Sequence, residues 1–298
     1  PSNREDFFTF TRMLIGQLRQ VGKTHTAERY VTVMNSFGRF RRENELLWEE
    51  VDSDLMVEYE TYLKSRGVCP NTSSYYMRGL RAIYNRAVEK GMTVQREPFK
   101  YVYTGIDKTI KRAVPLKVIR QIRDLDLTLF PTMDFARDIF MFSFYTRGMS
   151  FIDMAYLKKK DLQGGTLSYR RQKTGQQLFV KWEKPMQEIV DKYNTNGTPY
   201  LLPIIRDMNA DIRRQYKNAA HLVNDKLKKL GEKLGLTVPL TSYVARHGWA
   251  SIARSRNIPL AIISEAMGHD SEKTTRIYLA SLDTTSVDKA NSRILKAL

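Results

Sequence analysis

Apolar side chains in the first hundred residues recur every three or four positions, the spacing that gathers them on one face of a helix. This pattern predicts four helices, at residues 4–20, 26–42, 53–66 and 70–90. Asp52 or Ser53 can cap the third, and Pro70 opens the fourth. The apolar positions of the first two helices are Phe7, Phe10, Met13, Leu14, Leu18, Tyr30, Val33, Met34, Phe37 and Phe40.

The fourth predicted helix has two unlike faces. Its apolar face carries Tyr76, Leu80, Ile83 and Ala87, and its opposite face carries Ser74, Arg78, Arg81 and Asn85. After this helix, residues 98–115 break the periodic pattern and bring together the basic residues Lys100, Lys108, Lys111 and Arg112. Such a stretch indicates a linker between domains.

The second half combines helical patterns with one pair of alternating segments. We expect helices at 116–125, 133–145, 211–230, 242–255, 259–267 and 271–280. Residues 166–171 and 177–182 alternate like strands around the turn signal Lys173-Thr174-Gly175. The predicted fold class is mainly α: a helical bundle at 1–98, a basic linker at 99–115, and a mostly helical domain at 116–298 with a small antiparallel β-sheet.

The net charge of the chain indicates a polyanionic partner. The 298-residue chain has 49 Lys and Arg against 32 Asp and Glu, a formal net charge of +17. The basic residues are spread over both halves, which favours a folded surface on duplex DNA over a basic tail. We therefore take Arg78, Arg81, Lys108, Lys111 and Arg112 as candidate DNA-binding residues. The alternative for each is a plain solvated surface.

Composition excludes several other classes. The single cysteine, Cys69, rules out an internal disulfide and a cysteine-based zinc site, so we expect a reducing, cytoplasmic setting. No apolar run approaches the ~18 residues of a membrane span, so we expect no membrane partner. The first residue is Pro1 and not Met, which indicates a fragment or a processed chain.

Most familiar catalytic motifs are absent. The chain has no phosphate-binding GxxxxGK[ST] or GxGxxG loop, no HExxH and no GxSxG. The four histidines, His25, His221, His247 and His269, are not paired at metal-ligand spacing. We therefore expect neither a metal nor any other cofactor.

What remains is a group of basic and hydroxyl side chains near the C-terminus. Arg246 stands in TSYVARHGWAS, and His269 and Tyr278 stand in EAMGHDSEKTTRIYL. These segments resemble the arginine box, the GH box and the TTxxY ending of the tyrosine recombinase (phage-type integrase) family. Lys173, in YRRQKTGQQLFV, is similar to the family's hairpin lysine. With the helical first domain, the resemblance covers nearly the whole chain.

Two positions depart from the family pattern. Ser150 falls where the family has its first arginine, and Arg147 lies three residues earlier, about one helical turn or 4.5 Å along a helix axis. We hypothesise that Arg147 reaches the phosphate in its place. Tyr243 occupies the histidine position of the arginine box, and a phenol with a pKa of ~10 is a poor proton shuttle. Asp153 is expected to be a structural partner of a nearby arginine or of the backbone.

The resemblance implies a chemistry and a set of roles. Tyr278 would attack the phosphorus and form a 3′-phosphotyrosine link, Arg246 and Arg147 would bind the phosphate, and Lys173 would protonate the leaving hydroxyl. His269 would bond the phosphate or help to deprotonate Tyr278. The resemblance also implies a mobile-element recombinase or integrase that acts on the nucleoid as a tetramer on two DNA sites. A monomer without DNA and accessory DNA-bending proteins fit the same resemblance.

Three other functions stay open from the sequence. The first is a topoisomerase or resolvase of type IB character, which uses the same tyrosine chemistry on one duplex. The second is a catalytically silent DNA-binding relative, motivated by Ser150 and Tyr243. The third is a basic helical interaction module, whose DNA binding would lack a steep dependence on salt.

Overall fold

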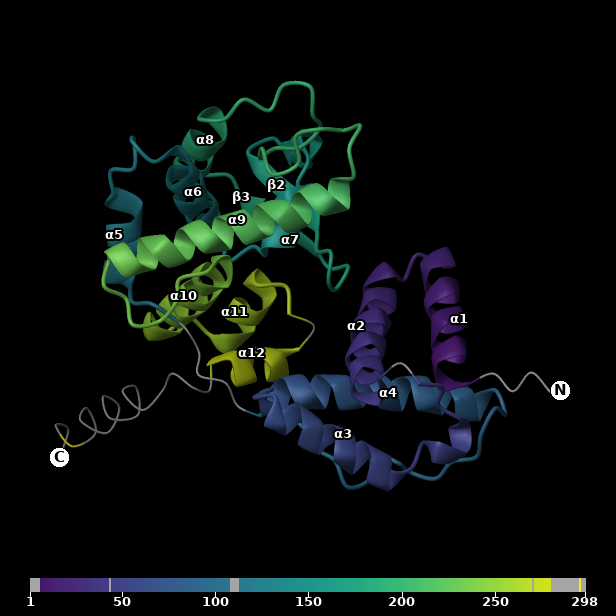
Figure 1. Cartoon of the computed structure of the whole chain (residues 1–298). Coiled ribbons are helices and arrows are strands. Elements are labelled where there is room, and N and C mark those ends of the chain that lie inside the picture. Colours follow the sequence, from purple (N-terminus) through teal and green to yellow (C-terminus); the bar gives the residue numbers. More distant parts are fainter. Residues whose placement is uncertain (1–5, 43, 108–112, 270, 280–294, 296–298) are drawn as a thin grey trace. The chain divides into compact units, whose positions relative to one another are not determined.

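The computed structural model describes residues 6–42, 44–107, 113–269, 271–279 and 295. The chain divides into two compact units, Pro1–Thr109 and Ile110–Leu298, and each unit has a hydrophobic core of its own (Figure 1). Helices dominate both units, and the described strands form one small antiparallel sheet. The predicted fold class is confirmed. Within the described residues, no helix has both the length and the apolar character needed to cross a membrane.

The first unit consists of α1 (Phe7–Gln20), α2 (Thr24–Arg41), the 3₁₀ turn η1 (Trp48–Glu50), α3 (Ser53–Ser65) and α4 (Pro70–Glu89). Side-chain caps set two of the helix starts, as expected for aspartate before a helix. The carboxylate of Asp6 accepts a bond of 2.8 Å from the Thr9 amide, and that of Asp52 one of 2.9 Å from Leu55. Pro70 occupies the first turn of α4, where its missing N–H costs nothing.

Aromatic rings fill the core of the first unit. Phe37 is fully buried and its ring centroid lies 5.7 Å from Phe7 and 4.9 Å from Tyr59, both edge-on. The hydroxyl of Tyr59 donates a bond of 2.8 Å to Ser36, so burial of this ring leaves no polar atom unpaired. The apolar periodicity of α1 and α2 in the sequence arises from this packing.

The segment after α4 belongs to the first unit for longer than expected. Phe99 and Val102, which we assigned to the linker, are buried in the first core. Beyond them, Asn71 of α4 exchanges two bonds with the backbone of Asp107, of 3.1 and 2.8 Å. The hydroxyl of Ser74 donates a bond of 2.5 Å to the Gly105 carbonyl. Residues 103–107 therefore lie along the polar face of α4.

The second unit begins with helices and contains the sheet in its middle. Its elements are α5 (Leu116–Asp124), α6 (Pro131–Tyr145), α7 (Phe151–Tyr156), η2 (Lys159–Asp161), β1 (Leu162–Gln163), β2 (Thr166–Arg170), β3 (Gln177–Lys181), α8 (Lys184–Asp191), α9 (Ile212–Lys233), α10 (Ser242–Ser255), α11 (Leu260–Ala266) and α12 (Glu272–Leu279). The structure adds α7, α8, β1 and both 3₁₀ turns to the predicted elements.

Helix α6 is the centre of the second core. Its run of Ile139, Phe140 and Phe142 is fully buried, and α9 and α10 pack against it. The long α9 is drawn in green across the second unit in Figure 1. It turns Val223, Leu227 and Leu230 inward and leaves most of its Lys and Arg residues outside, which is the pattern of an amphipathic helix.

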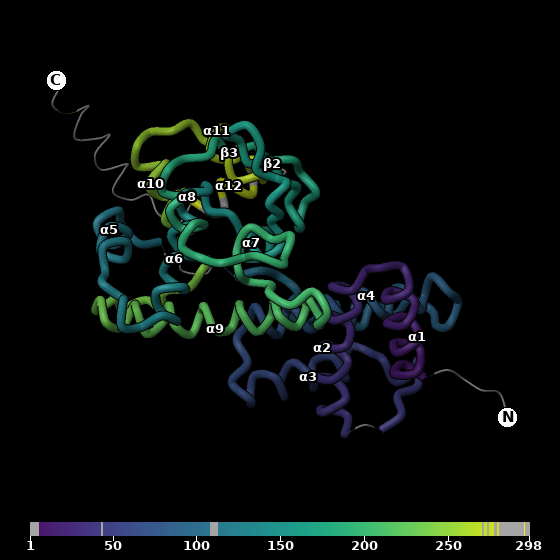
Figure 2. The backbone as a smooth tube through the Cα atoms, turned by 90° about the horizontal axis from the view of Figure 1, so that it is seen from above, coloured from purple at the N-terminus to yellow at the C-terminus, as the bar shows by residue number. Residues whose placement is uncertain are grey.

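The sheet has the strand order β1-β2-β3 and is antiparallel throughout. Leu167 pairs with Val180 and Tyr169 with Leu178, and all four side chains are buried. This alternation confirms the predicted hairpin around Lys173. Figure 2 shows α11 and α12 grouped with β2 and β3, and the close approach of Gly268 to Leu178 agrees with that grouping.

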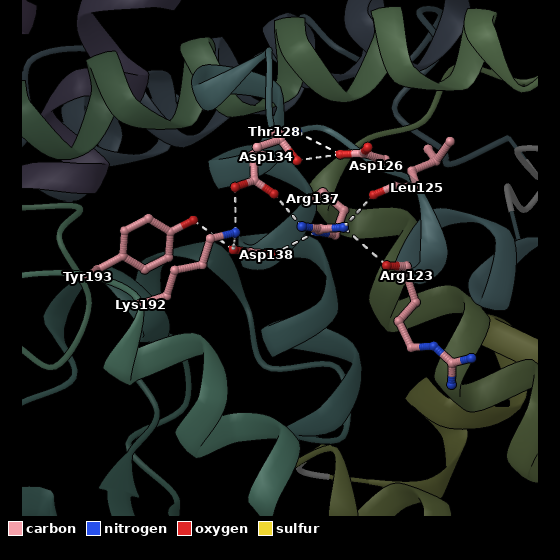
Figure 3. Close-up of polar contacts among 9 residues, drawn as sticks. All are labelled: Arg123, Leu125, Asp126, Thr128, Asp134, Arg137, Asp138, Lys192 and Tyr193. Carbon is pink, nitrogen blue, oxygen red and sulfur yellow. Dashed lines mark hydrogen bonds and ion pairs between the residues drawn. The ribbon is translucent and has the colours of Figure 1, made fainter.

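A polar network secures the outer side of α6 (Figure 3). The guanidinium of Arg137 donates bonds of 3.0 Å to the carbonyls of Arg123 and Leu125, which end α5. The same guanidinium pairs with Asp138 at 2.6 Å and with Asp134. Arg137 thereby ties α6 to the preceding helix and satisfies carbonyls that have no partner inside that helix.

The residues after α8 complete this network. The ammonium of Lys192 lies 2.7 Å from Asp138 and also contacts Asp134. The hydroxyl of Tyr193 donates a bond of 2.7 Å to Asp138, and burial together with this carboxylate raises the pKa of the phenol. The buried carboxylate of Asp138 thus has three partners: Arg137 on the same helix, and Lys192 and Tyr193 just after α8.

We predict that Asp138→Ala destabilises the second unit by about 3 kcal/mol, because removing one member of a buried ion-pair network leaves the others uncompensated. Amide hydrogen exchange of α6 in native conditions measures this loss. The control is Asp124→Asn, which removes the exposed ion pair with Arg123 and should leave exchange in α6 unchanged. Equal protection in Asp138→Ala and wild type would contradict the role of the network.

Candidate active site

The turn between α6 and α7 adopts an unusual backbone. Two consecutive residues, Arg147 and Gly148, have the positive φ angles of 62° and 75°. The hypothesis that Arg147 lies one helical turn before Ser150 is wrong in this respect, since α6 ends at Tyr145 and α7 begins at Phe151. Glycine is required at 148 because an added Cβ would lie 2.8 Å from the Cα of Arg246. The turn therefore rests directly on α10.

Arg246 is buried, and its guanidinium bonds three groups of the second unit. Arg246 extends from α10. Its Nη1 donates a hydrogen bond of 2.6 Å to the Gly148 carbonyl, and its Nη2 donates one of 2.7 Å to the Met267 carbonyl. Nη2 also lies 3.0 Å from Nε2 of His269. One side chain thereby links the α6–α7 turn, the end of α11 and the imidazole.

These contacts define the state of His269. Because a guanidinium only donates, Nε2 accepts from Arg246, and the proton of the neutral ring is on Nδ1. Nδ1–H then donates 2.7 Å to the hydroxyl of Thr275, which is fully buried in α12. Burial, together with the positive charges of Arg246, Arg171 and Lys173, lowers the pKa of His269 to about 4. The imidazole is neutral at pH 7.

Lys173 and Arg147 belong to the same charged region. Lys173 is exposed in the hairpin turn, yet its charge contributes to the lowered pKa of His269. Arg147 acts together with Arg246 and Arg171 on the buried phenol of Tyr169, where all three partly offset a pKa rise caused by burial. These charges place Arg147, Lys173, Arg246 and His269 in one region of the second unit.

Two more polar residues complete the region. Asp153 is buried. Its carboxylate accepts a hydrogen bond of 2.8 Å from the amide of Gln172 and one of 2.5 Å from the hydroxyl of Ser150. The guanidinium of Arg171 lies 3.7 Å from the same carboxylate. Asp153 is therefore a partner of both an arginine and the backbone, which confirms its expected structural role. Sequence analysis missed Arg171, although it stands two residues before Lys173.

The structure describes the side chain of Tyr243 but only the backbone of Tyr278. Tyr243 lies in the first turn of α10 with 55% of its surface exposed, and its ring contacts that of His247 edge-on, with 4.7 Å between the centroids. Tyr278 lies in the last turn of α12, three positions after Thr275, and its side chain lies outside the described residues. The backbone of the helix that carries Tyr278 is thus tied to His269 through Thr275.

The DNA-binding candidates fall into two groups. Arg78 and Arg81 lie on α4. Arg81 donates a hydrogen bond of 3.4 Å to the Thr104 hydroxyl, and Arg78 donates one of 3.3 Å to the Ser74 carbonyl. The expectation that Ser74 shares an open face with them is wrong: residues 103–107 cover it, and it is fully buried. Lys108, Lys111 and Arg112 lie outside the described residues.

Across the part of the chain that the structure describes, no three His, Cys, Asp or Glu residues are placed to hold a metal ion.

Comparison with known proteins identifies the class. The fold is that of a tyrosine-type site-specific DNA recombinase, and two family models support this assignment. The model of the phage integrase SAM-like domain matches residues 6–106, and that of the phage integrase family matches residues 131–285. Since the second match spans more than half of the sequence, the chain belongs to the phage integrase family.

Individual relatives are distant but cover most of the chain. Tyrosine recombinase XerA of Pyrococcus horikoshii is 23% identical over 77% of this chain and 90% of its own length. Tyrosine recombinase XerC of Syntrophus aciditrophicus is 25% identical over 86% of this chain and 87% of its own. These relatives extend the resemblance through both units.

Solved structures agree in fold. XerH recombinase bound to a palindromic difH substrate has a TM-score of 0.68 at 15% identity, with 93% of this chain and 84% of that chain covered. A lambda integrase dimer bound to a core site has a TM-score of 0.67 at 14% identity, with 93% and 77% covered.

We predict that Gly148→Ala displaces Arg246, because the new methyl group would collide with the backbone of α10. The rate of DNA cleavage should fall by about 10² or more, the usual effect of losing one aligned donor. Gly197→Ala is the matched control, since Gly197 has a φ of 81° and open space around its Cβ. It shares the left-handed strain without the collision, so equal cleavage rates in the two variants would contradict this interpretation.

The buried neutral His269 also predicts a pH dependence of stability. Its pKa is about 4 in the folded chain against 6.5 for an ordinary histidine, so between these values the unfolded chain binds more protons. The free energy of unfolding should therefore fall as pH decreases from 6.5 towards 4. Urea titrations across this range should show a shallower fall for His269→Gln than for wild type. Identical slopes would contradict the assigned protonation state.

Proposed function

We propose that the chain cuts and rejoins duplex DNA at specific sites through a 3′-phosphotyrosine intermediate, with Tyr278 as the nucleophile. The observation that carries the proposal is the cationic centre in which Arg246 bonds the neutral His269 beside the Lys173 hairpin. Attack on a phosphodiester increases the negative charge on its oxygens, and positioned guanidiniums stabilise that charge. The helix of Tyr278 is fastened to the same centre through Thr275.

Each group has a role that follows from its chemistry. The phenol of Tyr278 attacks phosphorus, the bond to the 5′ oxygen breaks, and the phosphate remains on the tyrosine. Lys173 carries a transferable proton on the exposed hairpin turn and supplies it to the leaving 5′ hydroxyl. In this proposal His269 takes the phenol proton at Nε2 once Arg246, which donates to this nitrogen in the structure, turns to the phosphate. Arg246 holds the phosphate and retains its own charge throughout.

Arg147 is proposed as the second guanidinium on the phosphate. Ser150 cannot fill this role, because it is the N-cap of α7. Its hydroxyl donates to the carboxylate of Asp153 and accepts from the Asp153 amide. A non-glycine residue in the left-handed region costs about 1–2 kcal/mol, and such strain is concentrated at functional sites. Arg147 has this conformation next to the glycine that contacts Arg246.

The proposed partner is duplex DNA, with a tetramer on two sites. The lambda integrase structures are described as a dimer on a core site and a tetramer on a Holliday junction, and this chain has the same fold. In this proposal the first unit is a core-binding domain and Arg78, Arg81, Lys108, Lys111 and Arg112 contact backbone phosphates. Tyr243 would donate a hydrogen bond to the phosphate. The charge of +17 supports such binding.

We predict that wild type forms a covalent complex with nicked suicide duplexes that carry the end sequences of the parent element, in the presence of EDTA. Tyr278→Phe should abolish it, because the phenol oxygen is the attacking atom. A protease-sensitive shifted band on a denaturing gel measures the link. The control is Tyr101→Phe, which removes the hydroxyl of an exposed tyrosine of the first unit. Tight salt-dependent binding without any band would favour a silent DNA-binding relative.

We predict that Arg147→Gly separates catalysis from stability. Relief of the left-handed strain offsets the greater freedom of glycine in the unfolded chain, so stability should stay within about 1 kcal/mol of wild type. Cleavage should fall by about 10²–10³ through loss of a transition-state donor. Asn257→Gly is the control, since Asn257 has a φ of 60° after α10. Normal cleavage by Arg147→Gly would exclude Arg147 from the site.

A further inference from the structure

We propose that Arg171 is a positioning residue that locks the Lys173 hairpin to the turn carrying His269, by joining buried Asp153 to the carbonyl of Gly268. The inference rests on the proposed function, because it assigns how two of the proposed catalytic groups are held in register. Arg171 stands in the same segment as Lys173, but the family resemblance gave it no role.

The contacts of Arg171 reach three separate segments. Its backbone closes the hairpin. The Arg171 amide donates a hydrogen bond of 2.9 Å to the Gln176 carbonyl, and the Arg171 carbonyl accepts one of 2.9 Å from the Gly175 amide. Its Nε faces Asp153 of α7, and its Nη1 donates to the Gly268 carbonyl. The side chain is 7% exposed. A buried guanidinium with these partners acts as a cross-link and not as a surface charge.

The site around Gly268 is shaped for this side chain. Gly268 has a φ of 62°, and a Cβ there would lie 2.7 Å from Cδ of Arg171 and 2.9 Å from Leu178. The turn before His269 therefore presses on the hairpin directly, with the arginine stem filling the contact. Arg246 binds the preceding carbonyl, that of Met267. Two arginines from different segments thus hold two consecutive carbonyls after α11.

Asp153 makes the cross-link rigid. The carboxylate is anchored by the Ser150 hydroxyl and by the amide of Gln172, which immediately follows Arg171 in the chain. Removing Arg171 would leave Asp153 buried without its arginine and the Gly268 carbonyl without this donor. Both losses loosen the register between Lys173 and His269, and misplacement by about 1 Å can cost about 10²-fold in rate.

The first test is a histidine NMR titration of the full chain without DNA, which does not depend on catalysis. The groups that face His269 are Arg246 of α10, Arg171 and Lys173 of the hairpin, and Thr275 of α12. Arg171→Gln removes a cation and loosens the turn, so the pKa of His269 should rise from about 4 towards 6.5. Lys181→Gln removes an exposed charge at the end of β3 and should leave it unchanged.

The second test is covalent capture with the suicide duplexes across a range of pH. Arg171→Gln should cleave about 10²-fold more slowly with DNA affinity close to that of wild type, because the buried residue positions catalytic groups and touches no phosphate. Lys181→Gln should retain the rate. If wild type forms no covalent complex, the proposed function fails, while the titration still decides the positioning role.

Arg171→Lys separates geometry from charge and covers the case in which Arg171→Gln does not fold. A lysine keeps the cation but cannot reach Asp153 and Gly268 with two nitrogens. Slow cleavage by Arg171→Lys supports the cross-link. Full recovery of the rate by lysine, or a His269 titration unchanged in Arg171→Gln, would overturn it.

Discussion

The site depends on one constraint: the carbonyls of Met267 and Gly268, after the short helix α11, are held by two buried guanidiniums. Helix ends leave carbonyls without partners, and here Arg246 and Arg171 supply the donors. Because these arginines come from α10 and the β2–β3 hairpin, their bonds bring both elements to the turn that carries His269. The position of the imidazole is therefore a property of the whole second unit.

Two glycines, Gly148 and Gly268, allow the two arginines to lie this close to the backbone turns. Gly148 lets the α6–α7 turn touch α10, and Gly268 lets the last turn touch the hairpin. Both have positive φ angles, so each position needs glycine for its backbone as well as for its lack of a side chain. The polar network of Arg137 and Asp138 works at a different place, on the outer side of α6, and stabilises the core on which these turns rest.

Much of this structure was predictable from the sequence, and the exceptions have physical reasons. The periodic helices α1 to α4 and α9, and the alternating hairpin, carry local patterns that a single sequence reveals. Helix α8 buries only two side chains, Met186 and Ile189, which are too few to define a helical period. The burial of Ser74 comes from residues 103–107 across α4, and the bond from Arg171 to Gly268 joins positions 97 residues apart. Motifs indicated Arg246 and His269, whereas Arg171 is recognised only through its contacts.

The neutral state of His269 has a consequence for the energetics of ligand binding. The lone pair at Nε2 faces a field of cations, and that field together with burial suppresses its affinity for protons. An anionic phosphate beside Arg246 would oppose this field and raise the proton affinity of the ring. DNA binding would then be accompanied by proton uptake from the medium, and the heat of binding in a calorimeter would depend on the ionisation enthalpy of the buffer.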